Sequence, residues 1–457
     1  MKSHARTTKA AAAALVAVPL TLGLLVVPTG TAASGSADTR AGCRLVPRYL
    51  PHTPDAVEGW FRSCLDRRPP PVSRSATRGA NPEGPRASAV AVEWQQTAIR
   101  TIFAETVPTP APPVGAMYLS FMSLAVHDAA RRAQRLGSHA ATAAVATAAH
   151  DVLHEYFPAS RAGLDADLVA SLGSVPDGRQ ESEGARVGEA AADRMIASRV
   201  GDGRGDTTVV YAKDPGLGVW QPAAGGVMAI AWLAFLDPVV DVPSVVLDGH
   251  DPIGSPAYAA DYEEVRMVGS ADSQVRTDEQ TAIARFFSRN PVLEYRDALC
   301  RYLESEPLGL LPTTRLFARI DAAQVTAFIQ TWRLKYDVGF WRPFQAIAAA
   351  ESDGNPGTLP HPATWVPLVN NPSYSDYTSG HAAATAPFAA VLRHTLGDDV
   401  PLLLKSGGLE RPYASLSALE HDALWARVWG GLHFRDAMDD GYLLGHTVAD
   451  QVIGAIR

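Results

Sequence analysis

The segment Tyr377-Thr378-Ser379-Gly380-His381-Ala382 stands where a polar stretch of the sequence gives way to an Ala-rich one. Ser379 is a suitable N-cap for a helix that we expect from Ser379 to Leu396, and Gly380 lets the backbone come close to a ligand. Free amides and the helix dipole favour an anion at such a start. His381 would lie in the first turn, where it could exchange a proton with that anion. An ordinary Ser cap beside a surface histidine would explain the segment equally well.

Two cations lie upstream, in the segment Lys335-Tyr336-Asp337-Val338-Gly339-Phe340-Trp341-Arg342-Pro343. Lys335 and Arg342 are seven residues apart, which is two helical turns, so we expect both on one face of a helix from Ile320 to Arg342. Pro343 biases Arg342 away from helical geometry and should end or kink that helix. An ammonium and a guanidinium together suit an oxyanion, although two cations on one helix face are more often a solvated surface.

The downstream segment Arg427-Val428-Trp429-Gly430-Gly431-Leu432-His433-Phe434-Arg435-Asp436 adds a third cation and a second histidine. Its two glycines should break the helix expected from Leu416 to Trp429, so that Arg427 and His433 converge from two elements. We expect Asp436 to accept the second ring proton of His433 and to fix its tautomer, and Arg435 to face solvent. One nitrogen of His433 is then left as a covalent ligand or a nucleophile.

In order, the three segments resemble the signature of the vanadium haloperoxidase and type-2 phosphatidic acid phosphatase (PAP2) superfamily, which runs Lys-x6-Arg-Pro, Pro-Ser-Gly-His and Ser-Arg-x5-His-x2-Asp. Their joint occurrence makes the resemblance specific, because each segment alone has an ordinary explanation. Thr378 stands where the family usually has Pro, and Ala426 stands where it usually has Ser. Neither departure changes a charge or a proton-transfer group. The stretches 94–199 and 255–269 also look like secreted bacterial haloperoxidase-related proteins.

For a haloperoxidase, the resemblance implies a vanadate bonded to a ring nitrogen of His433. The groups that hold its oxygens would be Lys335, Arg342, Ser379, the Gly380 amide and Arg427. His381 would serve as acid and base while hydrogen peroxide oxidises a halide to hypohalous acid, which then acts on an organic acceptor. Lys335 would polarise the bound peroxide, and Tyr374 falls where related enzymes shape the halide pocket. The resemblance also implies a homodimer, which no feature of the sequence demands.

Two alternatives use the same residues. In a PAP2-type acid phosphatase, His433 would attack the phosphorus of a phosphate ester to form a phosphohistidine, and His381 would protonate the leaving alcohol. A non-catalytic oxyanion-binding protein would need the cations and amides more than the two histidines, so the histidines disfavour it. The long helical region before the motifs and the expected secretion favour the peroxidase over the phosphatase.

The rest of the sequence predicts an all-α protein, a large bundle of about ten helices, and the resemblance implies that this bundle is of the haloperoxidase and PAP2 type. Ala-rich, amphipathic periodicity begins at Ser88, and stretches rich in Gly, Pro and polar residues interrupt it at 201–256 and 351–378. Further helices are expected at 89–105, 113–134, 140–156, 164–172, 181–199, 256–269, 278–290 and 437–456. We expect one helical region over 88–457, with an N-terminal part over 88–254 and a part over 255–457 that carries the motifs.

The N-terminus has the pattern of a secretory signal, with basic residues, an apolar run from Ala10 to Val27 and small residues at 31–33. We expect a signal peptide over 1–33, a Pro-, Ser- and Gly-rich arm over 34–87, and a secreted protein without stable membrane insertion. Cys43 and Cys64 are expected to form a disulfide, and Cys300 is expected to be a buried apolar side chain. The net charge of −8 provides no basic field for nucleic acid.

Overall fold

The computed structural model describes residues 84–361 and 364–457, with side chains from Ser88 onward. The expected signal peptide, most of the arm and the Cys43–Cys64 pair lie outside these residues. Helices make up most of the described chain, as the sequence predicts. They are α3 (Gly84–Ile99), α4 (Pro112–Ala133), α5 (Ser138–Tyr156), α6 (Arg161–Leu172), α7 (Arg179–Ser198), α8 (Pro256–Val268), α9 (Asp278–Phe286), α10 (Pro291–Ser305), α11 (Leu310–Asp337), α12 (Pro343–Ala348), α13 (Gly380–Leu396), α14 (Leu416–Trp429) and α15 (Arg435–Ala455). Among them, none is long and apolar enough to cross a bilayer.

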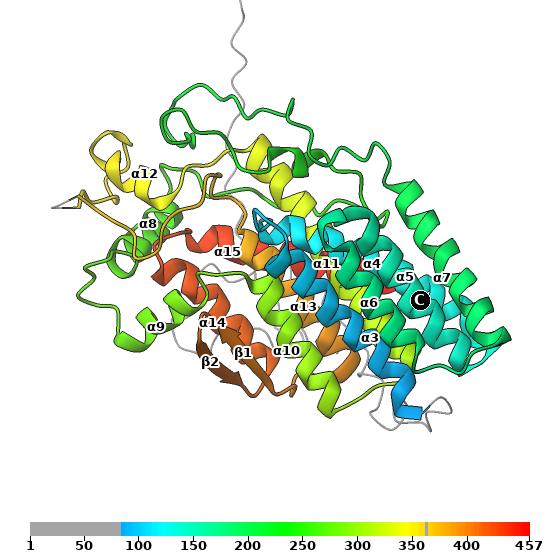
Figure 1. Cartoon of the computed structure of the whole chain (residues 1–457). Helices are drawn as coiled ribbons and strands as arrows, with labels where there is room; N and C mark the ends of the chain where they lie inside the picture. The colour runs from blue at the N-terminus through cyan, green and yellow to red at the C-terminus, as the bar shows by residue number, and fades with distance from the viewer. Residues whose placement is uncertain (1–83, 362–363) are drawn as a thin grey trace, which may run out of the picture. The chain divides into compact units, whose positions relative to one another are not determined.

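Helix α11 joins two groups of helices (Figure 1). On one side it packs against α4, which also contacts α5 and α7. On the other side it packs against α13 and α15, which contact each other. The buried alanines of α5 and α13 have short side chains, so neighbouring helices can approach them closely. The three segments that carry the cations and histidines end up around the second group, formed by α11, α13 and α15.

The contact between α13 and α15 is close because α15 presents glycine to it. A Cβ on Gly441 would lie 2.7 Å from the Cβ of Ala382, and one on Gly445 would lie 2.7 Å from the Cβ of Ala386. Real Cβ atoms essentially never come this close, so any side chain on Gly441 would push the helices apart. The same Cβ on Gly441 would meet the backbone nitrogen of Ser379 at 3.3 Å. These glycines therefore hold the beginning of α13 against the first turns of α15.

A ring of buried polar side chains links α3, α4, α10 and α11. Arg296 of α10 forms an ion pair with Asp321 of α11, and its Nη1 donates to Oε1 of Gln95 at 2.7 Å. Ser123 of α4 donates to Oδ2 of Asp321 at 2.6 Å and accepts from Nε2 of Gln95 at 2.8 Å. Arg296 and Asp321 are almost fully buried, so each charge depends on the other for compensation.

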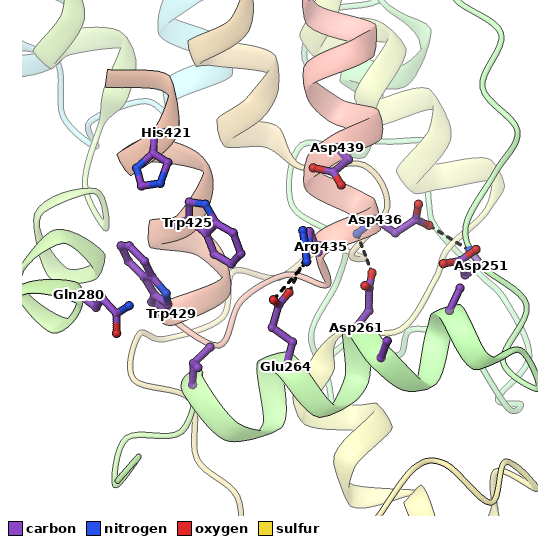
Figure 2. A pocket seen from close by; sticks show the side chains of 13 residues that line it. Asp251, Asp261, Glu264, Gln280, His421, Trp425, Trp429, Arg435, Asp436 and Asp439 are labelled. Atoms are coloured by element: carbon purple, nitrogen blue, oxygen red, sulfur yellow. Dashed lines mark hydrogen bonds and ion pairs between the residues drawn. The ribbon is translucent and has the colours of Figure 1, made fainter. Parts of the chain in front are cut away.

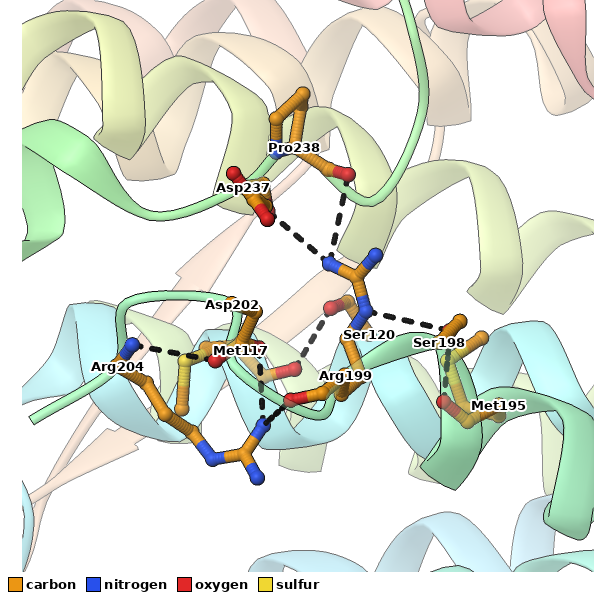
Figure 3. A network of polar contacts seen from close by, with 9 residues as sticks. All are labelled: Met117, Ser120, Met195, Ser198, Arg199, Asp202, Arg204, Asp237 and Pro238. Carbon is orange, nitrogen blue, oxygen red and sulfur yellow. Dashed lines mark hydrogen bonds and ion pairs between the residues drawn. The ribbon is translucent and has the colours of Figure 1, made fainter.

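The long connection after α7 is held by its own polar network (Figure 3). Nη1 of Arg199 donates to the carbonyl oxygens of Asp237 and Pro238, at 3.0 and 3.4 Å. Nη1 of Arg204 donates to the carbonyl of Arg199 and to Oδ2 of Asp202, both at 2.9 Å. The backbone nitrogen of Asp237 donates to the carbonyl of Asp202 at 2.8 Å. As expected, this stretch contains no α-helix between Arg199 and Pro256, and its Ala231–Phe235 turn is a short 3₁₀ helix.

The region after α9 and the segment before α14 differ from the prediction. The helix expected over 278–290 ends at Phe286, and a new helix, α10, begins at Pro291, where the side chain of Asn290 accepts from the Leu293 nitrogen. An antiparallel hairpin pairs β1 (Leu402–Ser406) with β2 (Leu409–Tyr413). Its turn is Gly407-Gly408, whose positive φ angles suit a two-residue hairpin loop. This dipeptide is a sequence signal that could have predicted the hairpin. Cys300 is buried, as expected.

Candidate oxyanion site

The beginning of α13 has the geometry that the sequence predicts. Ser379 is the N-cap, with φ −72° and ψ 127°, and its Oγ accepts from the Ala382 nitrogen at 3.5 Å. Its own backbone nitrogen donates to the carbonyl of Ala437 on α15 at 2.9 Å. Gly380 and His381 follow as the first two residues of the helix, where backbone amides lack an intrahelical acceptor. This helix start therefore offers N–H groups to an anion.

Lys335 and Arg342 do not share a helix face. Helix α11 ends at Asp337, and Gly339, with φ 64°, turns the chain so that Arg342 is extended and Pro343 begins α12. The expected helix to Arg342 is therefore wrong, because Pro343 starts a new helix instead of ending the old one. Both cations still converge, because both bind the carbonyls of one loop, residues 374–376.

The two cations contact that loop through short hydrogen bonds. Nζ of Lys335 donates to the carbonyls of Ser375 and Asp376, both at 2.8 Å. Nε of Arg342 donates to the carbonyl of Tyr374 at 2.6 Å. The ring of Tyr374 covers both cations, with its centroid 5.0 Å from Lys335 Nζ and 5.0 Å from Arg342 Cζ. Lys335 and Arg342 have no exposed surface, so both charges face the interior.

The third cation comes from the last turn of α14. Arg427 is buried and donates through Nη1 to the carbonyl of Phe287 at 3.1 Å. The helix ends at Trp429, and Gly431, with φ 73°, reverses the chain before His433, as the glycine pair predicts. Nη1 of Arg342 donates to the carbonyl of Leu432 at 2.7 Å, which brings the residue before His433 to the cations.

The carboxylate beside His433 is Asp376, and the expectation for Asp436 is wrong. Nδ1 of His433 lies 2.7 Å from Oδ1 of Asp376, within ion-pair distance, although the orientation is not that of a linear hydrogen bond. Oδ2 of Asp436 instead accepts from the Asp251 nitrogen at 3.0 Å (Figure 2). The spacing of three residues did not predict the contact correctly, because His433 precedes α15, which begins at Arg435. His433 and Asp436 therefore do not share a helical turn.

The site contains buried nitrogens that the protein leaves without a partner. Within residues 84–361 and 364–457, Nη2 of Arg342, Nε of Arg427 and Nε2 of His381 are buried without a hydrogen-bond partner. A buried polar group without a partner costs about 1–3 kcal/mol, and more when it carries charge. The two guanidinium nitrogens therefore fit a ligand that supplies negatively charged oxygens, and Nε2 of His381 could exchange a proton with it. A tetrahedral oxyanion such as vanadate or phosphate has that chemistry.

Burial and repulsion between neighbouring cations lower the pKa values of the basic side chains in the site. Burial first, and then the neighbouring cations, hold the pKa of Lys335 well below its usual value, and burial lowers the pKa of Arg427 to about 9. Burial, followed by the charges of the three cations, also holds the pKa values of His381 and His433 well below their usual value. Both imidazoles are therefore neutral and keep a lone pair, and a bound anion would relieve the repulsion among the cations.

Asp376 is the carboxyl group that balances part of this charge. It is fully buried, and burial raises its pKa to about 7, while the charges of Arg342 and Lys335 oppose that rise. It lies five residues before His381 in the sequence, inside the polar stretch that precedes α13. An acidic residue in a loop beside a predicted helix start was the available signal, but its pairing with His433 depends on the tertiary fold.

A pocket of about 560 Å³ lies next to the site, between α8, α14 and α15 (Figure 2). Trp425 and Trp429 line it, with ring centroids 5.8 Å apart in a stacked arrangement. Arg435 does not face solvent as expected, since its side chain pairs with Glu264 at 3.2 Å in this pocket. A smaller cavity shares Asp436 with this pocket and reaches Asp376.

The pocket wall is rich in carboxyl groups. Asp261, Asp436 and Asp439 line it together with Asp251 and Glu264. Burial raises the pKa of Asp436 to about 8, and it raises the pKa values of Asp261 and Asp439 to about 7. The pocket wall is therefore acidic, whereas the neighbouring site is cationic. None of the cations and histidines of that site lines the pocket.

One domain family and several solved structures are similar to this chain. Residues 315–457 match the family described as the VCPO second helical-bundle domain. The fold is similar to that of a bacterial vanadium-dependent iodoperoxidase, with a TM-score of 0.63 and 18% identity over 82% of this chain and 97% of that one. It is also similar to a bacterial vanadium-dependent chloroperoxidase in its holo form, with a TM-score of 0.60 and 15% identity over 78% of this chain and 95% of that one. No curated protein matches the sequence.

Proposed function

Because the chain has the fold of the vanadium haloperoxidase and PAP2 superfamily, and its residues 315–457 match a domain of that superfamily, we propose that it is a vanadate-dependent haloperoxidase-like enzyme. In this proposal, hydrogen peroxide oxidises a halide to hypohalous acid, which reacts with an organic acceptor. The observation that carries the proposal is the cluster of Lys335, Arg342 and Arg427, three buried cations with guanidinium nitrogens left unpaired within the described residues.

The residues present fit an oxyanion. Arg342 and Arg427 would donate to its oxygens through their unpaired nitrogens, and Lys335 would add a third positive charge. The amides of Gly380 and His381 would contribute the positive end of α13. When bound, vanadate would supply Lewis acidity toward hydrogen peroxide without changing its oxidation state.

The two histidines have different surroundings, and we assign them different roles. His433 is neutral and faces Asp376 with Nδ1, so its Nε2 is the nitrogen left to bind the metal. His381 has a buried Nε2 without a protein partner in the described part of the chain, and it lies in the first turn of α13. That nitrogen would accept a proton from the incoming peroxide and return it to a leaving oxygen.

The same residues would also serve an acid phosphatase, with His433 as nucleophile and His381 as the proton donor to the alcohol. The N-terminal helices support the peroxidase. The similarity to the iodoperoxidase extends over 82% of this chain, which is far more than the motif-bearing residues 315–457.

One pair of assays separates the proposals. Purified protein is tested for halogenation of an organic acceptor with vanadate, hydrogen peroxide and bromide or iodide, and for hydrolysis of a chromogenic phosphomonoester without vanadate. Halogenation without phosphatase turnover supports the peroxidase, and the converse overturns it. Tight vanadate binding without either activity would favour a non-catalytic oxyanion-binding protein. The His433→Ala variant is the control, because both activities require His433.

We also propose that the protein is exported and cleaved after its apolar N-terminal segment. Secretion would be tested by recovering the protein from the culture medium of an expressing bacterium and determining its first residues. A mature N-terminus near residue 34 is expected, and an uncleaved chain that stays with the cells would contradict the proposal. The homodimer stays a prediction that size-exclusion chromatography with light scattering can check.

A further inference from the structure

A second cluster of potential ligands lies on the N-terminal helices, away from the motif-bearing segments. His150 and His154 are four residues apart on α5, so both project from one face of that helix. Asp165 projects toward them from α6, which packs against α5 (Figure 1). From this arrangement we propose that His150, His154 and Asp165 bind a divalent transition-metal ion such as Zn²⁺.

The distances suit three ligands of one ion. Nε2 of His150 lies 3.0 Å from Oδ1 of Asp165, and Nε2 of His154 lies 3.7 Å from the same oxygen. The three ligand atoms all lie within 4.8 Å of one another. Zinc bonds of about 2.0–2.2 Å in a tetrahedron place neighbouring ligand atoms roughly 3.3 Å apart. Small side-chain rotations are therefore enough to close the site.

The neighbours of His150 orient it for this role. Its Nδ1 contacts Oδ1 of Asp151 at 2.7 Å, which directs Nε2 toward Asp165. A carboxylate on the far nitrogen of a metal-binding histidine is a common arrangement, because it fixes the ring and makes the ligand more basic. Trp94 packs edge-on against the His150 ring, with centroids 6.3 Å apart. Asp151 is thus a positioning residue for the proposed site.

The exposure of the other ligands leaves room for water. The His150 side chain is 11% exposed, whereas those of His154 and Asp165 are 34% and 59% exposed. Three protein ligands would hold the ion, and solvent would complete its coordination. Two imidazoles and one carboxylate favour Zn²⁺, Cu²⁺ or Ni²⁺ over Ca²⁺ and Mg²⁺, which prefer oxygen ligands.

A simple ion pair is the competing explanation. A protonated His150 could bridge Asp151 and Asp165 without any metal. In that arrangement His154 makes only a long ion-pair contact with Asp165, since 3.7 Å is too long for a hydrogen bond. In the metal site, His154 is a full ligand. The contribution of His154 therefore separates the two explanations.

The proposed ion would join α6 to the bundle. Leu164 is the one buried residue of α6, so few apolar contacts hold this helix. Polar contacts supply the rest, including the ion pair of Asp167 with Arg100. A metal bound between α5 and α6 would hold α6 in place, and it should stabilise the folded state in proportion to the metal bound.

Zinc binding by the full chain tests the proposal. Protein stripped with a chelator is titrated with Zn²⁺ by calorimetry, and thermal unfolding is followed with and without Zn²⁺. Wild type is expected to bind Zn²⁺ with a raised Tm, His154→Ala to lose affinity by at least 100-fold, and Asp151→Asn by about 10–100-fold. His139→Ala is the matched control, because His139 is exposed on the same helix and outside the cluster. It should bind as wild type does.

Some results would overturn the proposal. It fails if wild type binds no Zn²⁺, or if His154→Ala keeps wild-type affinity and Tm shift, since Zn²⁺ would then sit elsewhere, for instance on His381 and His433. Asp165→Asn provides a second variant at an exposed position, and it should also lose affinity. Circular dichroism of each variant without metal confirms that it is folded. Halogenation and phosphatase activity do not enter this test, so it is independent of the proposed function.

Discussion

The variant Asp376→Asn tests whether this buried carboxylate supports His433. Asparagine keeps the shape of the side chain but removes the charge, and Oδ1 of Asp376 lies 2.7 Å from Nδ1 of His433. The contact is not a linear hydrogen bond, so its effect is that of a charge beside a buried ring, which contributes on the order of 1 kcal/mol, the scale of one pKa unit. The substitution should therefore remove about 1–1.5 kcal/mol. We expect kcat/KM for halide oxidation to fall about tenfold, because 1.4 kcal/mol corresponds to a factor of ten.

The pH dependence of this loss has a definite sign. Burial raises the pKa of Asp376 to about 7, so the carboxyl group is mainly protonated below that pH and ionised above it. Below pH 7 the wild-type side chain is already neutral and resembles asparagine. The ratio of wild-type to variant kcat/KM, which reports on the free enzyme, should be close to one at pH 5.5 to 6 and should grow as the pH rises through about 7.

Asp436→Asn is the matched control, since Asp436 is the carboxylate that the motif spacing suggests. Its Oδ2 accepts from the Asp251 nitrogen, so we expect kcat/KM to stay within about twofold of wild type. Vanadate titration and circular dichroism establish that both variants are folded and loaded. A tenfold loss of activity in Asp436→Asn but not in Asp376→Asn, or a loss in Asp376→Asn that is independent of pH, would refute the role assigned to Asp376.

Three further variants probe the site and its scaffold. His381→Ala should lower turnover by about 100-fold or more, because general acid–base catalysis contributes about 10²–10⁴-fold. Its vanadate affinity should stay within a few-fold of wild type. Steady-state kinetics measure the turnover, and a vanadate titration measures the affinity. Arg427→Met should weaken vanadate binding by about tenfold or more, because it removes a buried cation whose Nε is unpaired within the described residues. Asp321→Ala should lower the free energy of unfolding by about 3–5 kcal/mol in urea titrations, because it leaves the charge of Arg296 buried without compensation.

Each of these has a control variant or an outcome that would contradict it. Equal losses of turnover and vanadate affinity in His381→Ala would make His381 a ligand rather than a proton carrier. Arg435→Met should leave vanadate affinity unchanged, because Arg435 pairs with Glu264 in the neighbouring pocket; a loss equal to that of Arg427→Met would show that overall charge controls binding. Replacing Arg296 and Asp321 together by Met and Leu should cost less than Asp321→Ala alone, and an equal cost would contradict the role of the unpaired charge.

The sequence by itself determined the helices and the chemistry of the candidate site. Apolar periodicity predicts most of the helices, including α14 to the residue, and the Ser379 cap and the Gly430-Gly431 break appear where local signals place them. These features depend on hydrogen bonds and side-chain contacts within one or two turns, which a short stretch of sequence contains. The residue types of the three segments likewise indicated an oxyanion site.

The tertiary structure decided which side chains meet. Lys335 reaches the site from α11 and Arg342 from the extended residue before α12, and Asp376 takes the place beside His433 that spacing assigned to Asp436. The Gly441 contact holds α13, which follows Asp376 in the chain, against α15, which follows His433, and it depends on the packing of whole helices. Spacing along the chain predicts contacts only while both residues share one regular element. Once a helix ends between them, as α11 does before Arg342, partners far apart in the sequence decide the geometry.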